Sequence, residues 1–292
     1  MASAYSSRLK RRMMKMSFEG TSITHVGDYW NARPCNIRHS PKPVGTAEYF
    51  DEVEARKYFV ESHIPGFADF AAWKGKKVLE IGCGIGTDTI SFARHGAQVT
   101  AVDLTPKSLE VARQRAQVFG LEDRIRFILA DAERLSDYVP VEQFDLVYSF
   151  GVIHHTPHPE RVVEQLRQYV SPGGAVKIMV YNRWSWKVLW VLSVYGKGQF
   201  WKLDRLIADY SEAQTGCPVT YSYSRRDGRR LLENHGFRVT DVTVDHIFPY
   251  RIADYVQYRY KAVWYFRWMP RALFRALERT FGWHLCLTAQ TK

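Results

Sequence analysis

The chain has few cysteines, and none of them lies near another. Cys35, Cys83, Cys217 and Cys286 occur singly among 292 residues, with no C-x-x-C pair and no cluster of cysteine with histidine. This spacing indicates neither a disulfide framework nor a zinc site, and it favours a reducing compartment. The chain also lacks an apolar run of about 18 residues, the length that crosses a bilayer. We therefore expect a cytoplasmic protein, with peripheral contact to a membrane as the alternative.

Acidic residues are missing from the start of the chain. No acidic residue precedes Glu19, whereas residues 1–24 carry 5 basic residues. This composition predicts a disordered basic tail over residues 1–24, with a transit peptide as the alternative. Residues 25–182 carry 18 basic and 20 acidic residues, and residues 183–292 carry 18 and 9, so the net charge of +11 comes from the two ends. Such an excess suits an anionic substrate, a lipid surface or nucleic acid, although solvated arginines explain it equally well.

From Lys76 onward, short apolar runs alternate with helical stretches. Near-continuous apolar strands separated by helices predict a parallel sheet that is covered on both faces. The expected strands are KVLEI, QVTAV, IRFILA, FDLVYSF, AVKIMVY, FRVTDVTVDHI and WHLCLTAQ. Helices are expected near residues 87–95, 106–119 and 159–170, the second with Thr105 as its N-cap and Pro106 as its first residue.

A glycine-rich turn after the first expected strand indicates a bound cofactor. Its pattern, E-x-G-x-G-x-G, runs from Glu80 to Gly86 and departs from the G-x-G-x-x-G dinucleotide motif, whose third glycine would fall at Thr87. Glycine in such a turn lets the backbone approach a ligand with no side chain in the way. Asp103 lies seventeen residues beyond Gly86, where a carboxylate can accept hydrogen bonds from both ribose hydroxyls. Taken alone, these residues fit either NAD or a nucleoside.

Further polar residues follow the next strands at the same edge of the sheet. Asp131 follows the third strand, and the adjacent His154 and His155 follow the fourth. Together with the glycine turn and Asp103, these motifs resemble the class I S-adenosylmethionine-dependent methyltransferases over residues 76–181. The branch in question includes the ubiquinone and menaquinone biosynthesis enzymes and many natural-product methyltransferases. The resemblance implies a Rossmann-like α/β fold with a seven-stranded, mostly parallel sheet, an antiparallel last strand and helices on both faces.

The resemblance also implies the cofactor and the residues that bind it. S-adenosyl-L-methionine would lie with its methionine part at the glycine turn, its ribose at Asp103 and its adenine at Leu104 and Asp131. The full set of expected cofactor residues is Glu80, Gly82, Cys83, Gly84, Gly86, Asp103, Leu104, Asp131, Ala132, Glu133, Phe150 and Tyr29.

Methyl transfer requires alignment of the acceptor, and a base only where the acceptor must lose a proton. His155 is the best candidate base; alternatively it caps the helix near Pro159 or only contacts the cofactor. His246 is a second candidate, and His154 is more readily explained as structural. The expected substrate residues are Trp30, Arg38, Tyr181, Arg183 and Tyr250. Tyr29, Trp30 and Arg38 would form a lid, unless their loop is simply packed by its aromatic rings.

We divide the chain into a basic tail at 1–24, an N-terminal helical cap at 25–73, a cofactor-binding core at 74–182, and substrate-lid insertions with the last two strands at 183–292. The insertions are rich in tryptophan, leucine and lysine, the composition of a helix at a bilayer interface. A buried wall of the substrate pocket is the other interpretation. Both imply an apolar or amphiphilic substrate.

The expected function is methylation of an apolar or aromatic small molecule on oxygen, carbon or nitrogen. An RNA methyltransferase and a non-catalytic cofactor-binding module are the alternatives, with nucleic acid disfavoured because the fourth strand ends in SFGV rather than an Asp/Asn-Pro-Pro-aromatic turn. Where the quinone-pathway enzymes carry acidic metal ligands, this chain has Gly151 and His154. The sequence therefore predicts no metal, and it leaves the oligomeric state open.

Overall fold

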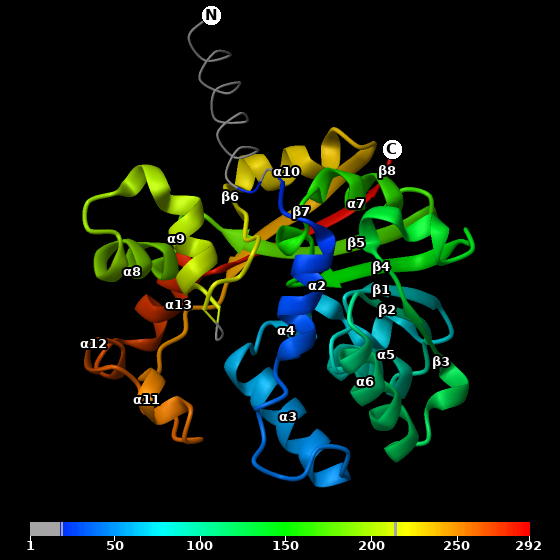
Figure 1. Ribbon diagram of the computed structural model, residues 1–292, viewed down its shortest axis with the longest axis horizontal. Coiled ribbons are helices and arrows are strands. Elements are labelled where there is room, and N and C mark those ends of the chain that lie inside the picture. Colours follow the sequence, from blue (N-terminus) through cyan, green and yellow to red (C-terminus); the bar gives the residue numbers. More distant parts are fainter. Residues whose placement is uncertain (1–17, 19, 213–214) are drawn as a thin grey trace, which may run out of the picture.

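A single mixed sheet organises the computed structural model, which describes residues 18, 20–212 and 215–292 (Figure 1). The strand order is β3-β2-β1-β4-β5-β8-β7, with the short β6 paired to β5. The strands are β1 Lys77–Ile81, β2 Gln98–Asp103, β3 Ile125–Leu129, β4 Phe144–Phe150, β5 Val170–Asn182, β6 Ser222–Tyr223, β7 Phe237–Asp245 and β8 His284–Thr291. Residues 1–17 and 19 of the expected basic tail lie outside the described residues, whereas the expected boundary at residue 24 is wrong, because a helix already begins at Ile23. The division of the chain at residues 73 and 182 stays a prediction.

The pairing of the strands confirms the expected fold class. The first five strands pair in parallel, whereas β8 runs antiparallel to both of its neighbours, β5 and β7. The antiparallel last strand therefore lies inside the sheet rather than at its edge. The path of seven strands agrees with the expectation, and the two-residue β6 is an addition to it.

Helices cover both faces of the sheet because successive strand residues point to opposite sides. In β1, Val78 belongs to the core that α5 and α6 cover, and the next residue, Leu79, belongs to the core that α7 and α10 cover. The helices that flank the sheet are α5 Thr87–Arg94, α6 Pro106–Val118, α7 Pro159–Leu166 and α10 Arg225–Glu233, with the 3-10 turns η2 Glu122–Arg124, η3 Ala132–Asp137 and η4 Ile153–His155.

Three further groups of helices surround this core. The N-terminal group comprises α2 Ile23–Ala32, α3 Ala47–Val60, α4 Ile64–Ala68 and η1 Phe70–Trp73. The two insertions comprise α8 Trp186–Tyr195, η5 Phe200–Lys202 and α9 Leu203–Tyr210, then α11 Ile252–Tyr255, α12 Trp264–Arg267 and α13 Arg271–Phe281. The insertions meet where the Trp186 ring lies 5.7 Å from that of Phe266, between centroids.

One local expectation needs correction, and another is confirmed with a hydrogen bond of a different kind. The helix expected over 159–170 ends at Leu166, because Val170 already pairs with Phe144 as the first residue of β5. The register then moves to Leu146 opposite Ala175, so residues 171–174 form a bulge within β5 rather than a turn before it. The expected N-cap of α6, Thr105, and its first residue, Pro106, are confirmed, although the Thr105 hydroxyl donates to Asp103 at 2.8 Å and makes no capping bond.

Candidate active site

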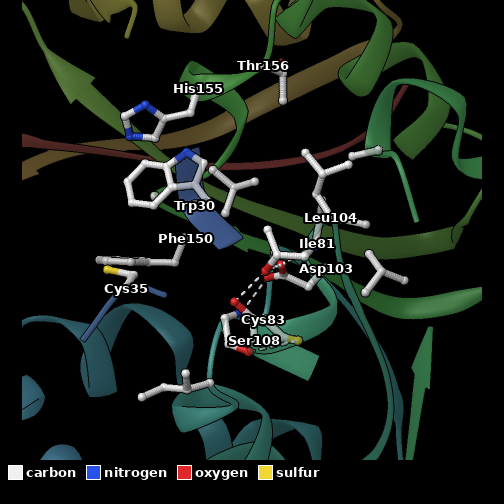
Figure 2. A pocket seen from close by; sticks show the side chains of 18 of the residues that line it. Trp30, Cys35, Ile81, Cys83, Asp103, Leu104, Ser108, Phe150, His155 and Thr156 are labelled. Atoms are coloured by element: carbon white, nitrogen blue, oxygen red, sulfur yellow. Dashed lines mark hydrogen bonds between the residues drawn. The ribbon is translucent and has the colours of Figure 1, made fainter. Parts of the chain in front are cut away.

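A cavity of about 210 Å³ lies at the carboxyl ends of β1, β2 and β4. The chain runs from β1 outward to β3 on one side and continues with β4 and β5 on the other, so the cavity lies at the point where the strand order reverses. The expected site residues that line it are Trp30, Gly82, Cys83, Gly84, Asp103, Leu104, Asp131, Ala132, Phe150, His155 and Tyr181. Figure 2 shows His155 and Trp30 in one part of this cavity and Asp103, Cys83 and Ser108 in another.

The glycine turn needs glycine for two different reasons. Gly82 and Gly84 have φ values of 75° and 54°, in the left-handed region that side chains disfavour. A Cβ on Gly82 would lie 2.2 Å from Cγ2 of Val152, whereas a Cβ on Gly84 would meet nothing within 4 Å. The space beside Gly84 is therefore part of the cavity and is open to a ligand.

The carboxylate of Asp103 organises the turn that follows β2. One oxygen accepts from the Gly84 N–H at 2.8 Å, and the other accepts from the N–H and the hydroxyl of Thr105 at 2.9 and 2.8 Å. Burial raises the pKa of Asp103, and the hydrogen bonds from Thr105 and Gly84 oppose that rise. The side chain thus ties the glycine turn to the start of α6 and still faces the cavity.

Asp131, Leu104 and Ala132 also line the cavity. Asp131 is the N-cap of η3, where its carboxylate accepts from the Glu133 N–H at 2.9 Å. The cavity does not include Glu133, whose carboxylate accepts from the His158 N–H at 2.7 Å.

Two other expected cofactor residues support the glycine turn from outside the cavity. Glu80 lies buried in β1 and accepts a hydrogen bond from the Thr89 hydroxyl of α5. Gly86 is the N-cap of α5, and a Cβ there would lie 3.1 Å from Cβ of Ala112 in α6. The third glycine therefore serves helix packing, whereas Gly82 and Gly84 line the cavity.

Helix α2 covers the cavity with one face. Ile23, Val26 and Trp30 line the cavity and follow one another at intervals of three and four residues, which places them on the same side of a helix. Tyr29 packs edge-on against Trp30 at 5.1 Å without lining the cavity itself. Burial raises the pKa of the Tyr29 phenol, which therefore stays neutral.

His155 presents an unpaired nitrogen within the cavity wall. Its Nδ1 lies 2.8 Å from the carbonyl oxygen of Val219, so Nδ1 carries the proton of the neutral ring and Nε2 carries the lone pair. Nε2 is buried without a hydrogen-bond partner among the described residues, and Oε1 of Glu212 lies 3.9 Å away. Burial favours the neutral ring, but Cys217 and Glu212 outweigh it and raise the pKa of His155 to about 9.

The other two expected histidines do not line the cavity. His154 is fully buried, with its ring 3.8 Å from that of Tyr181, and burial lowers its pKa so that it stays uncharged. His246 is also buried, and its ring lies 4.6 Å from that of His284, which does line the cavity.

Of the expected substrate residues, Trp30 and Tyr181 line the cavity, and three others do not. Arg183 donates to Asp204 and to the Ser222 hydroxyl. Arg38 is exposed, and Tyr250 packs in an aromatic cluster, 5.5 Å from the ring of Tyr260. The roles of these three residues stay predictions.

The cavity also includes residues that the sequence did not indicate. The polar ones are Cys35, Asn36, Lys57, Glu61, Thr87, Thr105, Ser108, Thr156, Glu212 and His284. Lys57 is already neutralised, since its Nζ lies 2.7 Å from the buried Asp88 carboxylate. Glu212 accepts from the Tyr181 hydroxyl at 2.8 Å. Burial raises the pKa of Glu61 to about 7 and lowers that of His284.

Comparisons with known proteins agree on one family. A family model described as a methyltransferase domain matches residues 78–174. The chain is 39% identical over 169 residues to the ubiquinone biosynthesis O-methyltransferase of Azoarcus sp. (strain BH72), which is 58% of this chain and 70% of that protein. The enzyme of the same name from Idiomarina loihiensis is 37% identical over 125 residues. That match covers 43% of this chain and 48%, about half, of the relative.

A solved structure supports the fold. Magnesium protoporphyrin IX methyltransferase from Synechocystis PCC 6803 with bound SAH superposes with a TM-score of 0.59 over 93% of this chain and 100% of that one, at 16% identity. At that identity the likeness concerns the arrangement of helices and strands only.

Proposed function

The chain belongs to the class I S-adenosylmethionine-dependent methyltransferases, and we propose that it methylates an apolar or aromatic small molecule on a hydroxyl oxygen. Its cofactor is S-adenosyl-L-methionine, as the sequence predicted. The relatives named above are O-methyltransferases of ubiquinone biosynthesis, which supports oxygen as the acceptor atom.

The cavity has the features that this cofactor requires. The free space beside Gly84 suits the methionine part, the Asp103 carboxylate suits two ribose hydroxyls, and Asp131 can accept from the adenine amino group. We propose that these three residues hold the cofactor, with Leu104 and Ala132 against its adenine. When bound, S-adenosyl-L-methionine supplies an electrophilic methyl group on a sulfonium.

Aromatic rings and His155 form the remaining part of the cavity. Trp30, Phe150 and Tyr181 offer apolar faces to an acceptor, and Trp30 packs 5.0 Å from the His155 ring. Because Nδ1 of His155 is held by the Val219 carbonyl, Nε2 is the atom that accepts the hydroxyl proton as the oxygen takes the methyl group. The buried and unpaired Nε2 is the observation on which we rest this proposal.

The purified chain, incubated with methyl-labelled S-adenosyl-L-methionine and a set of apolar phenols, is expected to label those with a free hydroxyl. The same phenols with that hydroxyl replaced by methoxy are the matched controls and should stay unlabelled. Mass spectrometry of the products identifies the methylated oxygen. Labelling of RNA instead, or tight cofactor binding with no labelled product from any phenol or from a lysate extract, would favour the two alternatives.

The outer surface of the insertions combines exposed aromatic and basic side chains. On α8, α9, α12 and α13 and the turns beside them, every exposed charged residue is basic. The largest exposed apolar side chains are Trp184, Leu189, Phe200, Trp201, Trp264, Trp268 and Leu273, and the exposed basic ones are Lys197, Lys202, Arg205, Arg267, Arg271, Arg275 and Arg279. These residues, which we call the insertion surface, occupy one side of the molecule, at the left in Figure 1.

The inner faces of the same helices support the cavity wall. Val188 of α8 and Ile207 of α9 are buried in one cluster with Met179 and Tyr181, both of which line the cavity. No helix of the described residues is long and apolar enough to cross a membrane. We propose that the insertion surface rests on an anionic lipid surface, where tryptophan rings enter the interface and basic residues face the headgroups. Cytoplasmic location stays a prediction.

Vesicles that contain phosphatidylserine are expected to carry the protein upward in a flotation gradient, and vesicles of phosphatidylcholine alone should carry much less. The double variant Trp264→Ala/Trp268→Ala should stay at the bottom, because these rings are 75% and 77% exposed and are free to enter the lipid. Leu129→Ala, which removes a 48% exposed side chain from β3, is the control and should float like the unchanged protein. Equal recovery at the bottom with both vesicle types would rule out this surface as a lipid contact.

A further inference from the structure

Four titratable side chains from distant parts of the sequence meet beside the cavity. Glu61 follows α3, His63 precedes α4, His246 follows β7 and His284 begins β8. His246 and His284 are 8% and 3% exposed, and burial lowers the pKa of both, so both rings are uncharged. Methyl transfer as described above uses none of the four.

The distances place donor atoms of these side chains around a common centre. Nε2 of His284 lies 3.6 Å from Oε1 of Glu61, and its Nδ1 lies 3.0 Å from Nε2 of His63. One nitrogen each from His246 and His284 and one Glu61 oxygen lie within 4.8 Å of one another. Ligand atoms bound to one zinc ion at about 2.0–2.2 Å are roughly 3–3.5 Å apart, so small rotations of these side chains close the set.

One nitrogen of each of these two histidine rings already has a partner. His284 is bonded through Nδ1 to His63, whose own Nδ1 lies 3.9 Å from Oδ1 of Asp245, and His246 is hydrogen-bonded to the backbone of Val60. Metal-binding histidines show this arrangement, in which one nitrogen is held by an outer partner and the other is directed to the ion.

The backbone at His246 also fixes the position of its ring. The residue has a φ of 71°, in the left-handed region that non-glycine residues rarely adopt. Its N–H donates to Asp245 Oδ1 at 2.8 Å, and its carbonyl accepts from the Trp283 N–H at 2.7 Å. These two bonds hold the residue in this conformation, and the second one joins it to Trp283, the residue that precedes His284.

We propose that Glu61, His246 and His284 bind one divalent first-row transition metal ion, for which Zn²⁺ fits best. Two imidazoles and one carboxylate form the ligand set of hydrolytic zinc sites, whereas Mg²⁺ and Ca²⁺ prefer oxygen ligands alone. Glu61 and His284 line the cavity, so the open coordination position faces it. This proposal departs from the sequence prediction of no metal. That prediction was based on Gly151 and His154, whereas the proposed ligands lie at positions 61, 246 and 284.

The position of the ion suggests what it would bind. An oxygen of the acceptor takes the open coordination position and is thereby oriented within the cavity, a step that rests on the proposed function.

The test measures binding of Zn²⁺ to the full chain after treatment with a chelator, by calorimetry and native mass spectrometry. One Zn²⁺ per chain is expected. His246→Ala, His284→Ala and Glu61→Gln should each weaken binding at least tenfold, because each removes one ligand. The matched control is His39→Ala, because His39 packs against Tyr255 and is not one of the proposed ligands. This variant should bind Zn²⁺ like the unchanged chain. Circular dichroism establishes that each variant is folded, and Glu61→Gln carries the test should the buried histidine variants unfold.

Co²⁺ in place of Zn²⁺ gives a visible spectrum that reports its ligands without any measurement of turnover. Adding a labelled phenol should shift this spectrum, and an unchanged spectrum would show that the ion does not orient the acceptor.

Absence of stoichiometric Zn²⁺ binding, or binding retained by all folded ligand variants, would overturn the metal site. Calorimetry with S-adenosyl-L-methionine on the same samples separates the two proposals: a chain that binds the cofactor but no Zn²⁺ loses only the metal site, and one that binds Zn²⁺ but no cofactor loses only the proposed function.

Discussion

Asp103→Ala is expected to weaken S-adenosyl-L-methionine binding by about a hundredfold. The proposed contacts to two ribose hydroxyls are hydrogen bonds to a charged acceptor, each of which contributes roughly 1.5–3 kcal/mol, and a tenfold change in affinity corresponds to about 1.4 kcal/mol. The substitution also leaves the N–H groups of Gly84 and Thr105 without the acceptor that now holds them. Calorimetry with S-adenosyl-L-methionine measures the change.

Two matched variants sharpen the assignment of Asp103. Asp123→Ala removes an exposed carboxylate from η2 and should bind the cofactor normally. Asp103→Asn keeps one acceptor oxygen but removes the charge, so its affinity should fall between those of the unchanged protein and Asp103→Ala. Affinity unchanged in folded Asp103→Ala would contradict the ribose assignment.

His155→Gln is expected to lower kcat by about a hundredfold while cofactor affinity changes by less than about twofold. General base catalysis by a positioned side chain typically accelerates a reaction by about 10²–10⁴, and the amide of glutamine cannot accept the proton. His158→Gln, the same change at an exposed position three residues later, should leave kcat unaffected. Single-turnover measurements at saturating cofactor give the rate, and full activity of His155→Gln would exclude this residue as the base.

The pH dependence of the rate follows from the raised pKa of His155. Nε2 can accept a proton only in the neutral ring, and with a pKa of about 9 the ring is mostly protonated at neutral pH. The kcat/KM should therefore rise by about tenfold per pH unit toward pH 9 and level off above it. His155→Gln should lose this rise, whereas His158→Gln should keep it.

The sequence predicted the sheet closely where apolar runs are short and bounded. KVLEI and FDLVYSF coincide with β1 and β4, because β-strands buried on both faces leave few alternatives for such runs. The end of the helix after Pro159 was wrong, since nothing local marks Val170 as a strand residue; its pairing with Phe144 decides it. Pairing across the sheet is a tertiary property that a periodic pattern does not contain.

The candidate site was predictable in part for the same reason. Residues at the carboxyl ends of β1, β2, β3 and β4, or in the turns after them, fall at one edge of a parallel sheet. Gly84, Asp103, Asp131 and His155 were therefore predictable from their order along the chain. Glu61 and Glu212 come from segments outside the sheet, and only the folded chain brings them to the cavity. His284 could have been suspected, because an antiparallel strand beside β5 begins where β5 ends, opposite Tyr181.

The place of β8 between β5 and β7 has a consequence for folding during synthesis. Among the strands that the structure describes, all others leave the ribosome before β8, yet β7 pairs with β8 alone and stays detached from the sheet until β8 enters. The register joins Ala175 to Gln290, a contact of long sequence separation that forms slowly. The nascent chain can assemble its nucleotide-binding half early, while His284 arrives with the final strand and completes the cavity wall last.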